Sequence, residues 1–484
     1  MAPSRDSHKV KLGLLGSGVV GEAIQEFIFN GYLPGKLAVD LEIVKIYTPH
    51  PAQKSRYSTH RALFTTDPEE VTDHPEIDIV VEVLGSQDES HLALFRDYII
   101  RALQKGKAVV TSDKAVLARF GREIREAARK YHQELRFEAC VGGGIPIIRA
   151  LTEGFAAEEP EAIYGIVNGT CNYILSEMEK GGSSYEQALK EAQDRGYAET
   201  NPKADTSGMD AEAKLILLAA VTFGLHVKPG VIWRKGIEEI SPIDFLYAGR
   251  KGACTIKQLA IARKADDAIE ALVAPVLVPR DHFLATINGP TNAIFFKGRR
   301  SQETFVSLSR TRPLKGKVGN QGSLPEGRDW NYVFVGPGAG GGPTAVAILG
   351  DVCELAQGRG RRLPGPPSLV APGGLAVQSQ DKICSRFYLR FIVEDQPGIV
   401  GDICQILGGR GINVSEIWQL HHSQDELKGL AQRYRLTEKA GQILPFAITL
   451  EKSSVGQVQE ALATIHQRDF VVAHPIWLPI WGLE

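Results

Sequence analysis

Acidic and basic side chains gather in one stretch of the sequence, G-Y-A-E-T-N-P-K-A-D-T-S-G-M-D-A-E-A-K, from 196 to 214. Asp210 and Lys214 are four residues apart and would therefore share one face of a helix. An exposed ion pair in this order stabilises a helix by only about 0.2–0.5 kcal/mol, so the spacing alone fits a structural role as well as a catalytic one. Together with Glu199 and Asp205, this pair makes a set of three carboxylates and one lysine within the stretch. Such a set suits a polar substrate that carries an amino group and a hydroxyl group.

A glycine-rich loop near the start of the chain could hold phosphate. Its sequence, G-S-G-V-V-G, follows an expected strand at 10–15 and precedes a helix at 22–29. In this context the glycines allow a tight turn, a close approach to pyrophosphate and close helix–strand packing. The alternative is an ordinary glycine-rich turn. The predicted cofactor-binding residues are Gly16, Ser17, Gly18, Val19, Val20 and Gly21.

The second expected strand, at 41–47, should indicate which nucleotide binds. A carboxylate at its end would bind the ribose hydroxyls of NAD, whereas a basic side chain accommodates the 2′-phosphate of NADP. The strand ends in I-Y-T-P-H without a carboxylate, and Lys54 and Arg56 follow. The sequence therefore favours NADP and leaves NAD possible.

Strands alternate with helices along the first 134 residues, which predicts an α/β, Rossmann-type parallel sheet. The expected strands are 10–15, 41–47, 77–84 and 108–111, and the expected helices are 22–29, 90–105 and 114–131.

Residues 135–357 form a predicted α+β catalytic and dimerisation domain, with strands at 162–167 and 283–288. Its last helix, from 344 to about 356, is expected to return to the nucleotide domain. The proline- and glycine-rich sequence from Gly358 to Ser368 predicts a linker, which we place at 358–384.

Residues 385–484 are expected to form a separate module. Strands at 386–393, 411–417 and 446–450 and helices at 399–408 and 455–466 account for the first five elements of an expected βαββαβ order.

Composition narrows the class of protein. At about 150 residues per domain, 484 residues predict about three domains. Hydrophobic residues make up 43% and charged residues 23%, and the net charge is −2, so nothing points to nucleic acid or an acidic membrane. No apolar run could cross a bilayer, the first eight residues lack a signal peptide's apolar core, and the six cysteines include no C-x-x-C pair. We expect a soluble, cytoplasmic protein.

The first 355 residues or so resemble the homoserine dehydrogenase family. Besides the glycine loop and the stretch at 196–214, four pieces match in family order: T-S-D-K at 111–114, E-A-C-V-G-G-G-I-P-I-I at 138–148, G-I-V-N-G-T-C-N-Y-I-L at 165–175 and G-P-G-A-G-G-G-P-T-A at 336–345. Asp113 and Thr206 depart from the usual family residues, at positions that do not carry the chemistry.

The resemblance implies reversible, nicotinamide-dependent reduction of L-aspartate 4-semialdehyde to L-homoserine. Reduction of the aldehyde creates an alkoxide that needs a proton, and Lys214 matches the family's proton donor. Lys114 is the second lysine, near the nicotinamide. Glu199 and Asp210 match residues that hold the substrate amino group, and Asp205 matches a supporting carboxylate.

Further cofactor and metal contacts follow from the same resemblance. Gly85 and Ser86 would line the cofactor edge, and Gly338 and Gly340 would approach it from the far side of the cleft. The loop at 138–145 resembles a monovalent-cation site, in which oxygen donors suit sodium. The alternative is a glycine-rich interdomain turn. The expected sodium ligands are Glu138 and the carbonyls of Val141, Gly143 and Ile145.

The C-terminal module resembles an ACT domain, through D-Q-P-G at 395–398 and G-I-N-V at 411–414. Such domains bind small amino acids at paired interfaces, which implies threonine as an effector, Asp395 and Asn413 as contacts, and a homodimer or homotetramer. A purely structural dimerisation module is the alternative.

Two rival functions stay open at this point. One is a related amino-acid dehydrogenase, against which the 196–214 signature argues. The other is a catalytically inactive regulator, which would not need two lysines and an acid cluster.

Overall fold

The computed structural model describes residues 9–31, 39–54, 58–85, 88–299, 331–358, 375–423, 427, 430 and 443–482. The chain forms two compact units, each built from three separate segments. The first unit comprises 1–167, 213–229 and 292–375, and the second comprises 168–212, 230–291 and 376–484.

The first unit contains the predicted parallel sheet, in the order β3-β2-β1-β4-β5-β6. Its strands are β1 (Lys9–Leu15), β2 (Asp40–Tyr47), β3 (Phe64–Thr65), β4 (Ile79–Glu82), β5 (Ala108–Thr111) and β6 (Leu135–Arg136). The connecting helices include α1 (Val19–Phe29), α3 (Glu89–Gln104) and α4 (Lys114–Lys130). Strand order reverses beside β1, which pairs with both β2 and β4. In open α/β sheets ligands bind at such a switch point, outside the carboxyl ends of the strands. The Rossmann-type prediction is confirmed.

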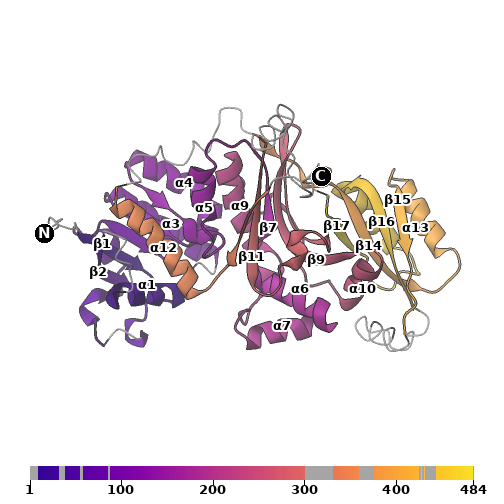
Figure 1. The fold of residues 1–484 in the computed structure, drawn as a ribbon, viewed down its shortest axis with the longest axis horizontal. Coiled ribbons are helices and arrows are strands. Elements are labelled where there is room, and N and C mark those ends of the chain that lie inside the picture. Colours follow the sequence, from indigo (N-terminus) through magenta and orange to yellow (C-terminus); the bar gives the residue numbers. More distant parts are fainter. Residues whose placement is uncertain are drawn as a thin grey trace, which may run out of the picture. The chain divides into compact units, whose positions relative to one another are not determined.

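A late helix, α12 (Gly341–Ala356), packs against α1 in this unit (Figure 1). Its buried residues Ile348 and Val352 belong to the same core as Ile24 of α1 and Val81 of β4. The unit also contains β7 (Pro160–Ile166), β11 (Thr291–Gly298), which pairs antiparallel with β7, and β12 (Asn331–Pro337) beside β11.

The second unit is built around the antiparallel hairpin of β9 (Cys254–Ala265) and β10 (Ala268–Pro279). Its helices include α6 (Gly169–Gly181), α7 (Tyr185–Asp194), α8 (Lys203–Thr206) and α10 (Pro242–Arg250). Helix α9 (Met209–Phe223) begins in this unit and continues in the first.

The strand expected at 283–288 is wrong, because Phe283–Thr286 forms a 3-10 turn. His282 caps this turn: its Nδ1 accepts the Leu284 N–H at 3.1 Å, and its carbonyl accepts the Ala285 N–H at 3.0 Å. These local hydrogen bonds satisfy the backbone without a partner strand.

The C-terminal segment has the predicted order βαββαβ among its described residues. The elements are β14 (Cys384–Glu394), α13 (Ile399–Gly408), β15 (Val414–Trp418), β16 (Ile443–Ser454), α15 (Val455–His466) and β17 (Ile476–Ile480), with sheet order β17-β14-β16-β15 (Figure 1). This sheet continues into the hairpin, because β17 pairs with β10 and the Trp481 N–H donates to the Leu277 carbonyl at 2.8 Å. Most of the expected linker, 359–374, lies outside the described residues.

A buried ion pair also ties this segment to the rest of the second unit. Arg390 of β14 donates from Nε to Asp244 of α10 at 2.7 Å, and both side chains are 0% exposed. Asp244 also accepts hydrogen bonds from the Tyr388 hydroxyl and from Ser241. The C-terminal segment is therefore an integral part of this unit's core rather than a tethered addition.

Candidate active site

The glycine loop between β1 and α1 has the geometry of a phosphate cradle. Gly16 has φ +115°, and a Cβ at Gly21 would collide with the Gly16 carbonyl oxygen. A Cβ at Gly18 would meet no described atom within 4 Å, and no side chain caps α1. The first N–H groups of α1 are thus accessible at the end where the helix dipole favours an anion.

The rest of this loop is partly buried and partly exposed. Ser17 is buried, and its hydroxyl accepts a hydrogen bond from Gln25 at 3.0 Å. Val19 is exposed, and a Cβ at Gly341 would lie 2.8 Å from its Cγ1. The loop that contains Gly338 and Gly340 therefore lies against the cofactor loop within one unit, through a glycine that the sequence analysis did not single out.

A buried carboxyl group, Glu82, stands at the end of β4. Its oxygens are hydrogen-bonded to the Thr111 hydroxyl and, at 2.8 Å, to the Leu84 N–H. Burial, reinforced by repulsion from Asp113, raises the pKa of Glu82 to about 8. At neutral pH Glu82 is therefore mainly a neutral acid. The sequence reasoning missed this residue, although an acidic residue inside the apolar run I-V-V-E-V-L could have revealed it.

Hydrogen bonds link Glu82 to the start of α4. The Thr111 hydroxyl also accepts the Asp113 N–H at 3.0 Å, and the Asp113 carboxylate accepts the N–H groups of Ala115 and Val116. Asp113 is thus the N-cap of α4, whose first residue is Lys114. Gly85, with φ +74°, follows β4, and Ser86 lies outside the described residues.

Lys214 is a buried lysine on α9, with 7% of its surface exposed. Its ammonium donates a hydrogen bond to the carbonyl of Val167 at 2.8 Å. This hydrogen bond fixes the position of the ammonium.

Asn168, the next residue along the chain, joins two of the expected substrate carboxylates. Its amide nitrogen donates to Asp205 at 2.7 Å and to Asp210 at 2.8 Å. Its amide oxygen accepts the Cys171 N–H at 2.8 Å and so caps α6. Sequence patterns do not assign this role to Asn168, because its partners Asp205 and Asp210 are distant in sequence.

Glu199 is placed differently from these two carboxylates. It lies in the loop between α7 and α8 with an exposed side chain, and its backbone carbonyl accepts a hydrogen bond from Gln193 at 3.0 Å. The structure therefore brings Asp205 and Asp210 together through Asn168, and holds Glu199 by its backbone.

The expected cation loop is held by Glu138. The carboxylate accepts the N–H groups of Ile148 and Arg149 at 2.8 Å, while burial and the nearby Asp351 raise the pKa of Glu138 to about 7. Among the described residues no group of three His, Cys, Asp or Glu could hold a metal ion. An ion at this loop would depend on backbone carbonyls, as a hard monovalent cation can.

The glycine-rich loops that contain Gly143 and Gly338 are in close contact. Gly143 has φ +55°, and a Cβ there would lie 2.7 Å from the backbone of Gly338. The Ile145 carbonyl accepts the Ile147 N–H at 2.8 Å, which leaves it a second lone pair. Sodium binding by Glu138 and the carbonyls of Val141, Gly143 and Ile145 stays a prediction.

The two expected effector contacts are both exposed. Asp395 lies between β14 and α13, and Asn413 precedes β15, where its carbonyl accepts the Glu451 N–H at 3.0 Å.

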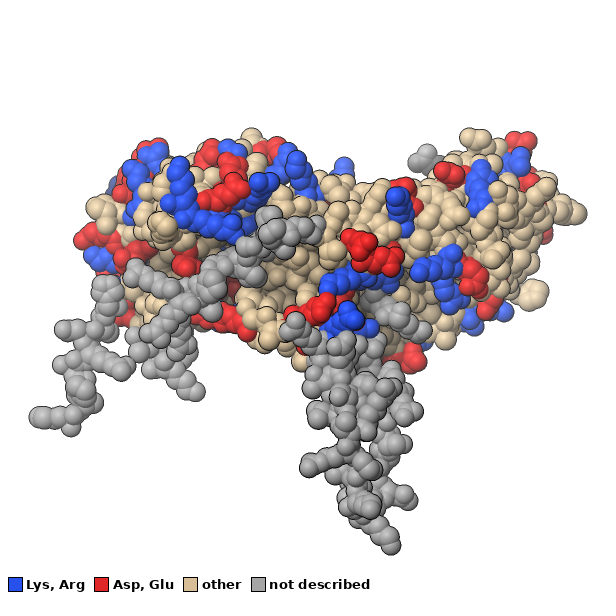
Figure 2. Space-filling view, turned by 90° about the horizontal axis from the view of Figure 1, so that it is seen from above, with Lys and Arg blue, Asp and Glu red and all other residues tan. Residues whose placement is uncertain are grey.

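Charged side chains of both signs lie on the surface. On the face shown in Figure 2, basic and acidic side chains are interspersed. Within the described ranges, no helix is both long and apolar enough to span a membrane.

Comparison with known proteins identifies two family models in this chain. One, described as homoserine dehydrogenase, NAD binding domain, matches residues 16–138, and the other, described as homoserine dehydrogenase, matches residues 146–311.

Relatives match over most of the chain. The homoserine dehydrogenase of Synechocystis sp. is 34% identical over 85% of this chain and 89% of its own length, and that of Mycobacterium bovis is 35% identical over 86% and 87%. The crystal structure of a homoserine dehydrogenase from Thiobacillus denitrificans superposes with a TM-score of 0.80 at 30% identity, covering 99% of both chains.

Proposed function

This chain belongs to the homoserine dehydrogenase family, and we propose that Lys214 moves the proton in its reaction. The protein is an NAD(P)-dependent oxidoreductase that reversibly reduces L-aspartate 4-semialdehyde to L-homoserine. A bound nicotinamide nucleotide supplies or accepts the hydride. Lys214 would give a proton to the substrate oxygen during reduction and would accept it during oxidation.

The observation that carries this assignment is the setting of Lys214. Its buried ammonium is fixed on the carbonyl of Val167, directly before the residue whose side chain holds Asp205 and Asp210. Asp210 also precedes Lys214 by one helical turn on α9. A carboxylate for the substrate ammonium and a lysine for the substrate oxygen are thus fixed on one helix.

The other site residues take supporting roles in this proposal. Glu199 and Asp210 hold the substrate amino group, and Asp205 supports Asp210 through Asn168. Lys114, at the start of α4, is the second lysine near the nicotinamide.

For the cofactor, the open position at Gly18 and the accessible N-terminus of α1 fit a pyrophosphate. The loop from Gly16 to Gly21 would hold the pyrophosphate, while Gly85, Ser86, Gly338 and Gly340 would line the remainder. Strand β2 ends at Tyr47 without a carboxylate, which favours NADP over NAD; Lys54 follows, and Arg56 lies outside the described residues.

The test is absorbance at matched NADPH and NADH concentrations with aspartate semialdehyde. We expect oxidation of both nucleotides, with a higher kcat/KM for NADPH. Oxidation of neither would contradict the enzymatic function, and a higher value for NADH would reverse the nucleotide assignment alone.

A monovalent cation at 138–145 and an effector at the C-terminal segment complete the proposal. The carbonyls of the loop fit sodium, so exchange of sodium for tetramethylammonium should lower activity reversibly.

Threonine would bind near Asp395 and Asn413 in a cytoplasmic homodimer or homotetramer. Measuring activity against threonine concentration tests the effector, and light scattering tests the oligomeric state. An enzyme whose activity threonine does not change would favour a purely structural C-terminal segment.

A further inference from the structure

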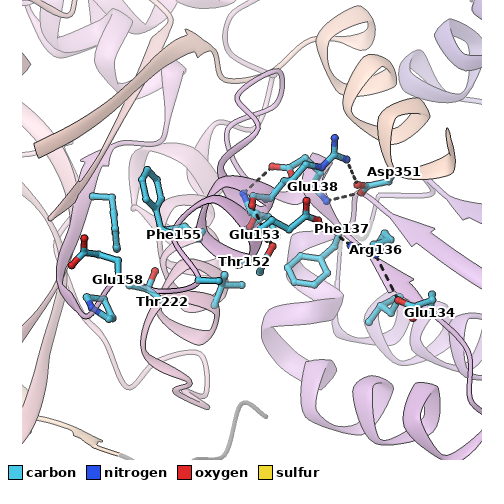
Figure 3. A pocket seen from close by; sticks show the side chains of 18 residues that line it. Glu134, Arg136, Phe137, Glu138, Thr152, Glu153, Phe155, Glu158, Thr222 and Asp351 are labelled. Atoms are coloured by element: carbon cyan, nitrogen blue, oxygen red, sulfur yellow. Dashed lines mark hydrogen bonds and ion pairs between the residues drawn. The ribbon is translucent and has the colours of Figure 1, made fainter. Parts of the chain in front are cut away.

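A cavity of about 440 Å³ lies within the first unit, lined by none of the cofactor-loop residues and not by Lys114 or Lys214. Its walls come from β6, the π-helix at Ala150–Gly154, the end of α9, β11 and α12, and Figure 3 shows side chains that line it. The volume is within the range of about 300–1,000 Å³ that small-molecule sites occupy. One wall includes Glu138, whose carboxylate is already bonded to two backbone N–H groups.

Arg136 presents an incompletely bonded guanidinium at one end of this cavity. Its side chain is 18% exposed, and its Nε is buried without a hydrogen-bond partner among the described residues. Glu134, Glu153 and Glu354 surround it, but each lies 3.9 Å away, beyond hydrogen-bond distance. A planar guanidinium with unused donors matches a carboxylate, which it can bind through two parallel hydrogen bonds.

The surrounding carboxylates exclude a simple anion as the occupant. Glu134 and Glu153, which surround Arg136, also line the cavity. An added negative charge alone would be repelled by them, and a positive charge alone would leave Arg136 unbonded. A ligand with a carboxylate and an ammonium on neighbouring atoms satisfies both groups.

The remaining walls are mostly apolar. Figure 3 shows Arg136 and Glu134 toward one end, Phe155, Thr222 and Glu158 toward the other, and Thr152 and Glu153 between. Leu151, Val221 and Phe296 also line the cavity. The hydroxyl of Thr222 is a second buried polar atom without a partner in the described part of the chain.

From this arrangement we propose that the cavity binds an L-α-amino acid with an apolar side chain. Its carboxylate is bonded to Arg136, its ammonium lies between Glu134 and Glu153, and its side chain packs on Phe155, Val221 and Phe296. The site is separate from the proposed catalytic groups and does not depend on their assignment.

The test uses the full-length protein at fixed sodium concentration, with L-leucine as the probe, in isothermal titration calorimetry and thermal unfolding. We expect saturable binding and a raised Tm. The analogues 4-methylpentanoate, which lacks the ammonium, and 3-methylbutylamine, which lacks the carboxylate, should each bind at least about tenfold more weakly.

Variants locate the site. Arg136→Met should lower L-leucine affinity at least about tenfold, as should the more conservative Glu153→Gln, which covers a failure of the first variant to fold. Arg119→Met, which removes an exposed partner of Glu89, is the matched control and should bind as wild type does. Lys214→Ala should also retain binding, because Lys214 does not line the cavity.

Four results would overturn the proposal. They are no binding of L-leucine, unchanged binding in the folded Arg136 and Glu153 variants, equal binding of either analogue, and loss of binding in Lys214→Ala, which would place the probe at the catalytic site.

Discussion

Two carboxyl groups in this protein are equally buried and differently compensated. Glu82 in the first unit and Asp244 in the second are both 0% exposed. Asp244 has the guanidinium of Arg390 at 2.7 Å, whereas Glu82 is bonded to a hydroxyl and a backbone N–H, with Asp113 as its charged neighbour. Burial is therefore the same for the two carboxyl groups, and their charged neighbours differ. What separates them is the countercharge: Asp244 has a guanidinium partner, whereas burial without such a partner favours the neutral form of Glu82.

This difference extends to their surroundings. The first unit also contains Glu138 and Asp351, whose pKa values burial raises to about 7 and about 6, beside the expected cation loop. Asp244 and Arg390 instead join α10 to β14 inside the core of the second unit. We therefore expect substitutions at Glu82, Glu138 or Asp351 to change how stability depends on pH, and substitutions at Asp244 or Arg390 to lower stability.

The largest expected effect comes from Lys214→Ala. This variant tests whether turnover can be lost while stability is kept. Turnover should fall by about 10²–10⁴-fold, the contribution that general acid–base groups usually make. Cofactor affinity and Tm should stay close to wild type. Steady-state kinetics, nucleotide titration and thermal unfolding give the three values, and a variant with more than half of the wild-type kcat would remove Lys214 from the mechanism.

Arg390→Met should have the reverse profile. Removal of the guanidinium leaves Asp244 buried without its countercharge, which costs about 3–5 kcal/mol of unfolding free energy. The folded fraction should keep its kcat. Urea unfolding measures the loss, and Arg390→Met with Asp244→Asn should recover part of it because the amide carries no charge. A single variant as stable as wild type would show that the pair is not a structural anchor.

Deletion of residues 376–484 should lower the unfolding free energy of the second unit at least as much as Arg390→Met does. The deletion removes both Arg390 and β17, which pairs with β10.

The βαββαβ order of this segment was predictable from alternation in β14 and the apolar spacing of α13 and α15. Its integration into the unit was not, because the partners Asp244 and Arg390 are 146 residues apart in sequence.

The active-site features also fall into two classes, those that local sequence patterns predict and those that depend on tertiary packing. The loop Gly16–Gly21 and the helical spacing of Asp210 and Lys214 are local patterns, and local patterns can be read from sequence. The bridge from Asn168 to Asp205 and Asp210, across 37 and 42 residues, depends on tertiary packing. The 3-10 turn at Phe283–Thr286 escaped prediction because a histidine cap, rather than alternation, decided its structure.

A smaller effect is expected from Glu199→Ala. Loss of a charge-assisted hydrogen bond to the substrate ammonium should raise KM for homoserine by about tenfold, with KM for the nucleotide unchanged. The side chain is exposed in the structure, so Tm should not change. Asp194→Ala, at the exposed end of α7, is the control. Equal weakening of nucleotide binding would place Glu199 elsewhere than at the substrate.

The smallest effect on activity, and the most direct test of the comparison, is expected from Glu82→Gln. The pKa of Glu82 is raised from 4.5 to about 8, so between these values the folded protein binds a proton that the unfolded chain has released. Stability should therefore fall as pH rises through this window, and the glutamine variant, which cannot titrate, should lose that part of the slope.

At pH 7 the variant should keep nearly wild-type kcat, because Gln presents a similarly shaped neutral group to Thr111 and Leu84. Unfolding free energies from pH 5 to 9 for wild type, Glu82→Gln and the control Glu42→Gln, at a partly exposed partner of Lys9, measure the difference directly. The titration of Glu138 and Asp351 is common to all three proteins. Parallel curves for wild type and Glu82→Gln would mean that Glu82 is ionised throughout. Burial without a countercharge would then not be enough to keep Glu82 neutral, and the distinction drawn from the partners of the two carboxyl groups would fail.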